Sequence, residues 1–252
     1  MATFYFVEHP MNEPRYGRAA KGERIPVRWA ICQPHHRKFM MRQGECLDGS
    51  NIKYEKLYFW GEYEAHSDCI IKNTTNTPMA IHDVLYPVRG TAPLLTKVQN
   101  TDPYVFGNHF KNICCGIRNR KYEHGDVVLF GYKKGNCFYF DTVFVVDRKR
   151  NIDYFHQTTQ YYKASIEPLN RDRKNAKPSL PRVEYYFQGI SYYENREYYS
   201  FVPCTLDYTT QQLPSVSPQE FRKKVVTKER WDMILFAVYE AGWLQGVHVD
   251  KI

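Results

Sequence analysis

The sequence predicts an α+β protein built mainly of antiparallel β-strands, with helices near its carboxyl end. Most apolar runs are four to eight residues long, rich in Val, Ile, Tyr and Phe, and bounded by Gly, Asn, Asp or Pro, which is the pattern of strands. The segment 131–136 separates two such runs and has the length and residues of a hairpin turn. Helical spacing of apolar residues appears only in the last quarter of the chain.

The strand pattern recurs along most of the chain. We expect strands at Thr3–Val7, Val27–Cys32, Leu57–Tyr63, Asp126–Gly131, Phe138–Val146, Val183–Ile190 and Tyr198–Pro203. Residues 170–181 are basic and have almost nothing to bury, which is typical of a loop or linker. This predicts a β-rich core over 1–169, the linker, and a strand pair plus helices over 182–252 that pack on the core.

Two helices are expected near the carboxyl end. The first begins at residues 217–220, where Ser217 offers a hydroxyl cap, proline follows at the first helical position, and Glu220 lies at the third. The second spans Lys228–Tyr239, and Gly242 is well placed to end it. Its apolar residues recur three or four apart, which is typical of a face that packs on a core.

Composition limits the compartment and the partner. Lys and Arg number 35 against 27 Asp and Glu, a formal net charge of +8, which favours an acidic partner such as nucleic acid or a nucleotide, although ordinary solubility also explains it. The seven cysteines are scattered and odd in number, so we expect reduced thiols. No apolar run is long enough for export or for crossing a membrane, so we expect a cytoplasmic protein with no membrane partner.

The segment from Tyr122 to Arg148 carries a family resemblance. Gly125-Asp126 leads into an apolar strand, a glycine turn follows, and a longer strand returns through alternating apolar residues. This resembles the central hairpin of the PUA-like superfamily, the small barrels that include EVE, ASCH and YTH domains. The chain is also loosely similar to the uncharacterised nucleotide-modification-associated domain proteins. A plain hairpin in an unrelated sheet has the same pattern.

The resemblance implies a partly open PUA-like barrel with additional strands. It also implies recognition of a nucleobase, often a modified one, in an aromatic pocket. Only Gly125 and Asp126 match a position of the family pattern, so no list of family site residues can be transferred to this chain.

Candidates for binding a base come from the residues themselves. Stacking needs aromatic ring faces, and hydrogen bonding to a base edge needs short polar side chains. Residues 100–110 combine both, and alternation along 58–64 places a tryptophan and a carboxylate on one strand face. The candidates are Trp60, Glu62, Asn100, Asp102, Tyr104, Phe106, Asn108 and His109. A turn that leads into a strand and a half-buried sheet face remain the alternatives.

Basic clusters provide candidates for phosphate contacts. These are Arg118, Arg120, Lys121, Arg148 and Arg150, and they follow a phosphate backbone if one surface gathers them. Scattered, solvated charge is the alternative. Cysteine and histidine spacings are too irregular to predict a metal site, and no nucleophile or phosphate-loop motif occurs. We therefore predict no metal and no cofactor.

Three functions remain open at this point. The first is a module that binds nucleic acid or a nucleotide through the base candidates. The second is an enzyme that modifies a nucleotide or nucleic acid, with Asp102, His109 or Glu62 as acid or base. The third is a protein-interaction module that uses the tyrosine-rich segment 185–199. The oligomeric state does not follow from the sequence.

Overall fold

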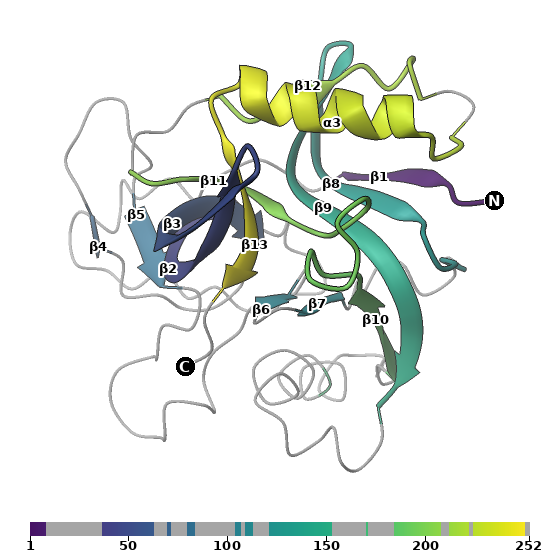
Figure 1. Cartoon of the computed structure of the whole chain (residues 1–252), viewed down its shortest axis with the longest axis horizontal. Helices are drawn as coiled ribbons and strands as arrows, with labels where there is room; N and C mark the ends of the chain where they lie inside the picture. Colours follow the sequence, from purple (N-terminus) through teal and green to yellow (C-terminus); the bar gives the residue numbers. More distant parts are fainter. Residues whose placement is uncertain are drawn as a thin grey trace, which may run out of the picture.

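A computed structural model shows two sheets and a helix packed around a shared interior (Figure 1). The structure describes residues 1–8, 37–62, 70–71, 80–83, 104–106, 109–112, 121–152, 170, 184–207, 212–221 and 224–249. The predicted strand Val27–Cys32 and the predicted linker 170–181, apart from residue 170, lie outside this part of the chain.

The larger sheet has seven strands in the order β1-β8-β9-β10-β7-β6, with β12 also paired to β9. Their bounds are β1 (Phe4–Glu8), β8 (Val127–Lys134), β9 (Cys137–Asn151), β10 (Tyr185–Gly189), β7 (His109–Asn112), β6 (Tyr104–Phe106) and β12 (Ser215–Val216). β1 lies parallel to β8, and the other pairings in this sheet are antiparallel. The hairpin between β8 and β9 turns at Gly135, whose φ of +62° suits glycine.

The second sheet contains a closed antiparallel barrel of four strands. β2 (Arg37–Asp48) pairs with β3 (Asn51–Glu62), β3 with β11 (Val202–Thr205), β11 with β13 (Leu244–Val249), and β13 again with β2. β5 (Ala80–Asp83) extends the sheet from β2, and β4 (Ile70–Ile71) pairs with β5. Closure leaves these four strands without a free edge along the paired residues.

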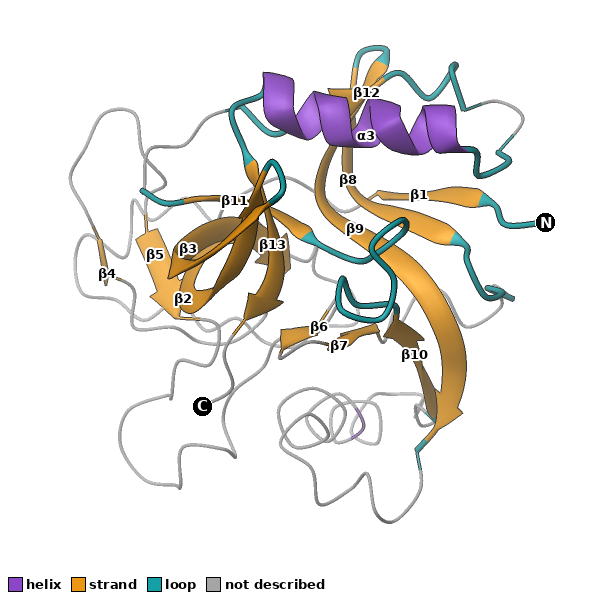
Figure 2. Ribbon diagram, in the orientation of Figure 1, coloured by secondary structure: helices purple, strands orange, loops and turns teal. Residues whose placement is uncertain are grey.

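Two hydrophobic clusters hold the sheets and the helix together. One fills the barrel, where Met40, Cys46 and Phe59 are buried, and it continues along one face of the larger sheet. The other lies beneath α3 (Lys228–Glu240), which crosses the sheet as Figure 2 shows. Trp231, Ile234 and Val238 form its buried face at the predicted helical spacing. Burying such side chains contributes roughly 1.5–3 kcal/mol each.

The Gly125-Asp126 pair forms a structural corner. Gly125 has a φ of +82°, in the left-handed region that favours glycine. Asp126 is 2% exposed, and its carboxylate accepts hydrogen bonds from the backbone N–H of Thr3 at 2.7 Å and of Glu123 at 2.8 Å. These bonds join the start of β1 to the start of β8. The carboxylate therefore serves the fold at this position.

The predominance of β-strands is confirmed, as are the strands expected near β1, β3, β8, β9 and β10. The helix at 228–239 is confirmed, with Thr227 as its cap and Gly242 at a φ of +73° beyond its end. The expected helix at 217–220 is instead a turn, in which Glu220 N–H donates to the Ser217 carbonyl. Phe221 ends this turn buried against Phe4, with ring centroids 4.9 Å apart, so packing decides the local structure.

Strands from 182–252 lie in both sheets. β10 and β12 belong to the larger sheet, whereas β11 and β13 help to close the barrel. Within the described ranges, no helix is both long and apolar enough to cross a bilayer.

Candidate nucleic-acid interface

The basic end of β9 extends beyond its partner β8. The pairing with β8 stops at Val145, opposite Val127, whereas β9 continues to Asn151 along β10. Figure 1 shows this end of the strand curving away from β8 toward β10. Arg148, Lys149 and Arg150 are exposed on it. β9 therefore carries three exposed cations beyond the end of β8, with Lys149 on the face of the sheet opposite to Arg148 and Arg150.

The three cations have different partners. Arg148 Nε lies 2.5 Å from Asp147 Oδ2, and this hydrogen bond raises the pKa of the guanidinium. Arg150 Nε donates to Gln188 Oε1 at 3.2 Å. Lys149 Nζ lies 3.7 Å from the centroid of the Tyr185 ring. Among the described contacts of these three residues, only that of Arg148 is with a carboxylate. The positive charges of Lys149 and Arg150 are therefore not neutralised by a described carboxylate and can bind an anion.

A row of aromatic rings starts beside Lys149. The ring centroids of Tyr185 and Phe187 are 5.9 Å apart, those of Phe187 and Tyr122 are 5.1 Å apart, and those of Tyr122 and Tyr5 are 4.9 Å apart. Each contact is edge to face, the favourable arrangement of aromatic pairs. Phe187 and Tyr122 are buried, whereas Tyr185 and Tyr5 at the two ends are partly exposed. Tyr185 therefore combines an accessible ring with a fixed position.

Strand register links this end of β9 to the predicted base candidates. Arg148 is opposite Gln188 on β10, Gln188 is opposite Lys111 on β7, and Lys111 is opposite Tyr104 on β6. Positions directly opposite one another share a face of the sheet, so these four occupy one row. The backbones of Tyr104 and Arg148 are separated by three strand spacings of about 4.8 Å each, so they lie roughly 14 Å apart across the sheet. Arg148 and Tyr104, a predicted phosphate contact and a predicted stacking residue, thus share one face of the sheet, and Lys149 and Tyr185 lie on the other.

The other predicted residues lie elsewhere or outside the described part. Phe106 and His109 face each other across β6 and β7. Trp60 and Glu62 belong to β3 in the barrel, and the half-buried Trp60 packs against Phe39 with ring centroids 5.1 Å apart. Lys121 is exposed. The candidates outside the described residues are Asn100, Asp102, Asn108, Arg118 and Arg120.

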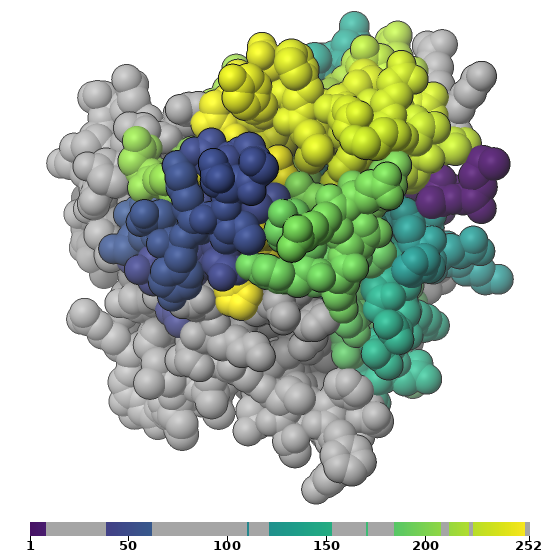
Figure 3. All heavy atoms as spheres, in the orientation of Figure 1, coloured from purple at the N-terminus to yellow at the C-terminus, as the bar shows by residue number. Residues whose placement is uncertain are grey.

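Sequence reasoning missed the contact of Lys149 with Tyr185, and the row on the opposite face that holds Gln188 and Lys111. Their signals were present, because Lys149 lies inside a basic cluster and Tyr185 begins the tyrosine-rich segment. The missing information was the pairing of β9 with β10 and of β10 with β7. Figure 3 shows the green segment that follows β10 next to the teal end of β9 at the surface.

The tyrosine-rich segment itself is largely structural. Tyr186 and Tyr199 are buried. Tyr192 packs edge to face on Tyr199 with centroids 5.0 Å apart, while Tyr193 is 45% exposed and hydrogen-bonds to the Glu45 carboxylate. This leaves few tyrosine rings in the segment for a flat protein contact.

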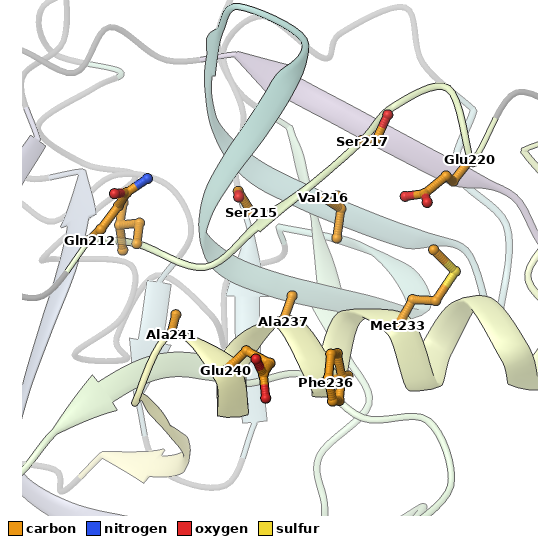
Figure 4. A pocket seen from close by; sticks show the side chains of 11 residues that line it. Gln212, Ser215, Val216, Ser217, Glu220, Met233, Phe236, Ala237, Glu240 and Ala241 are labelled. Atoms are coloured by element: carbon orange, nitrogen blue, oxygen red, sulfur yellow. The ribbon is translucent and has the colours of Figure 1, made fainter.

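A groove of about 480 Å³ lies between α3 and β12, away from the predicted site residues (Figure 4). Among the described residues, its lining includes two carboxylates, from Glu220 and Glu240, and no Lys or Arg. This arrangement disfavours a phosphate-bearing ligand there.

No metal site emerges from the described ranges, which hold no group of three or more His, Cys, Asp or Glu side chains arranged around a common point. The thiols of Cys46 and Cys204 meet inside the barrel, where burial raises the pKa of Cys204. Comparisons with protein-family models, with curated proteins and with solved structures found no match to this chain.

Proposed function

We propose that this chain binds single-stranded nucleic acid or a nucleotide at the basic end of β9, where this strand pairs with β10. The observation that carries the proposal is the position of Lys149, whose ammonium lies 3.7 Å from the Tyr185 ring, next to Arg150. A cationic groove beside accessible rings is the usual arrangement in proteins that hold single strands. The net charge of +8 supports the same class of partner.

The chemistry assigns a role to each group. Lys149 has a flexible four-carbon stem, so its ammonium can move from the ring to a phosphate while a base takes its place on the Tyr185 face. Arg150 and Arg148 offer guanidinium donors to neighbouring phosphates along the strand. Tyr104 shares a sheet row with Arg148 on the face opposite to Lys149 and Tyr185, so stacking at this site is assigned to Tyr185 alone.

The finer identity of the ligand follows the resemblance to PUA-like barrels. We propose a base, modified or unmodified, that is presented single-stranded or flipped out of a duplex. Its edge is read by short polar side chains from the predicted set. Catalysis at Glu62, Asp102 or His109 and a cytoplasmic location remain predictions.

Binding across a salt series tests the proposal. We expect a fluorescein-labelled single strand to bind, with log K falling by about 0.7 per phosphate contact for each unit of log salt concentration. Lys149→Ala with Arg150→Ala should weaken binding and flatten this slope by about 1.4. Tyr185→Ala should remove roughly 1–3 kcal/mol of stacking.

The matched control is Lys53→Ala with Lys133→Ala. Both lysines are exposed and far along the sheets from the basic end of β9, and this pair changes the net charge equally. If log K depends on log salt concentration with the same slope in both double variants, the binding comes from the net charge of the protein and not from a site at β9. That result, or the absence of binding at low salt, would overturn the proposal.

A further inference from the structure

The groove between α3 and β12 has an apolar floor. Met233, Phe236 and Ala237 line it from the helix, and Leu213 and Val216 line it from the opposite segment. Figure 4 shows the Met233 and Ala237 side chains rising from the helix toward the strand that carries Val216. Its volume of about 480 Å³ falls within the range of about 300–1,000 Å³ typical of ligand sites.

The outer face of α3 exposes more aromatic surface than a solvated helix needs. Phe236, which lines the groove, is 62% exposed, and Tyr239, one turn farther along, is 77% exposed. A surface helix normally presents polar side chains on the face opposite its buried stripe. Large apolar side chains gathered beside a concavity are characteristic of interaction sites.

The charged side chains that line the groove indicate which kind of ligand it can bind. Glu240 lies in the last turn of α3, which has no basic residue, so its carboxylate adds to the negative end of the helix dipole. Glu220 lines the opposite wall. On the Glu220 side Arg230 Nε donates to the Glu220 carbonyl oxygen at 3.2 Å, whereas the described lining of the groove is acidic at the Glu240 end. A cation bound here would relieve the repulsion between Glu240 and the helix end.

We propose that this groove docks a short extended segment of a partner protein in which a lysine or arginine adjoins an apolar residue. The apolar side chain lies on Phe236 and Met233, and the cation lies against Glu240 at the end of α3, with Glu220 at the other end of the groove. Nucleic acid is disfavoured, because its phosphates would meet these two carboxylates. The site is separate from the basic end of β9 and does not depend on the function proposed there.

Anisotropy of a short labelled peptide of alternating leucine and lysine tests the docking. We expect saturable binding, weakened about tenfold by Phe236→Ala and about tenfold by Glu240→Lys, each corresponding to about 1.4 kcal/mol. Glu240→Lys should also raise Tm, because a cation in the last turn favours the helix dipole, so its loss of binding cannot result from unfolding. A peptide with glutamate in place of lysine should not bind.

Two control variants match these changes outside the groove. Tyr54→Ala removes an exposed ring from β3, and Glu55→Lys makes the same charge change on that strand. Both should leave peptide affinity unchanged. Absence of binding, equal binding of the glutamate peptide, or insensitivity to Phe236→Ala and Glu240→Lys would overturn the proposal. The proposal would also be overturned if the protein self-associates at higher concentration and this self-association abolishes peptide binding. The occupant of the groove would then be a second copy of the chain.

Discussion

Asp126 offers the sharpest test of how β1 is joined to β8 in the larger sheet. Its carboxylate is buried and accepts two backbone hydrogen bonds, from Thr3 at 2.7 Å and Glu123 at 2.8 Å. A hydrogen bond to a charged group contributes about 1.5–3 kcal/mol, and removing the acceptor leaves its partner N–H unsatisfied. Because both hydrogen bonds to Asp126 are only partly buried, we assign each a contribution in the lower half of this range. Asp126→Ala should therefore lower the free energy of unfolding by about 3–4 kcal/mol.

Asp126→Asn removes the charge of the side chain but keeps its shape, so it isolates the contribution of the charge to stability. The amide keeps one acceptor oxygen and turns an N–H donor toward the other backbone N–H, so about 2 kcal/mol should be lost. Urea unfolding followed by circular dichroism measures both variants, and Asp232→Ala is the control. Asp232 pairs with Lys228 on the exposed face of α3, where solvent screening leaves an ion pair with little effect on stability. An Asp126→Ala protein as stable as Asp232→Ala would refute the structural role of the corner.

Two further predictions concern a turn and a titration. A Cβ at Gly131 would overlap the carbonyl oxygen of Tyr139, whereas Gly135 has open space but a φ of +62°. Thermal unfolding should show a loss of about 3 kcal/mol for Gly131→Ala and only about 1 kcal/mol for Gly135→Ala, and the reverse order would contradict the sheet register. Burial, and next its hydrogen bond to Glu45, raises the pKa of Tyr193 from 10 to about 12. The neutral phenol therefore stabilises the fold fully below about pH 10, and this stability disappears as the pH rises through 12. Between pH 10 and 12 the free energy of unfolding should fall less steeply in Tyr193→Phe than in the unchanged protein. If the two curves of stability against pH are parallel, the pKa of Tyr193 is not raised.

Local patterns predicted much of the secondary structure because each signal lies within a few residues. The helix at 228–239 shows its apolar spacing and its glycine stop, and the β8–β9 hairpin shows its turn. The turn at Ser217 was mispredicted because the local capping signals compete with burial of Phe221 against Phe4. Tertiary packing overrides such local preferences.

The arrangement in space depends on pairings between distant segments. β2 has a mixed pattern because Phe39 and Leu47 pack outside the barrel while Met40 and Cys46 pack inside it. Closure of the barrel requires β13, some 200 residues away in the chain, to pair with β2. The row from Arg148 to Tyr104 likewise depends on the register of β9, β10, β7 and β6. No local signal encodes these contacts, so the predicted residues could not be assembled into one surface from the sequence.

Photocrosslinking of a single strand that carries 5-iodouracil most directly tests whether nucleic acid binds at the basic end of β9. Mass spectrometry should find the adduct on Tyr185, and excess unlabelled strand should suppress it. Lys149→Ala with Arg150→Ala should reduce its yield. Adducts confined to other surfaces, or a yield that this double change leaves intact, would contradict base stacking at this end of the sheet.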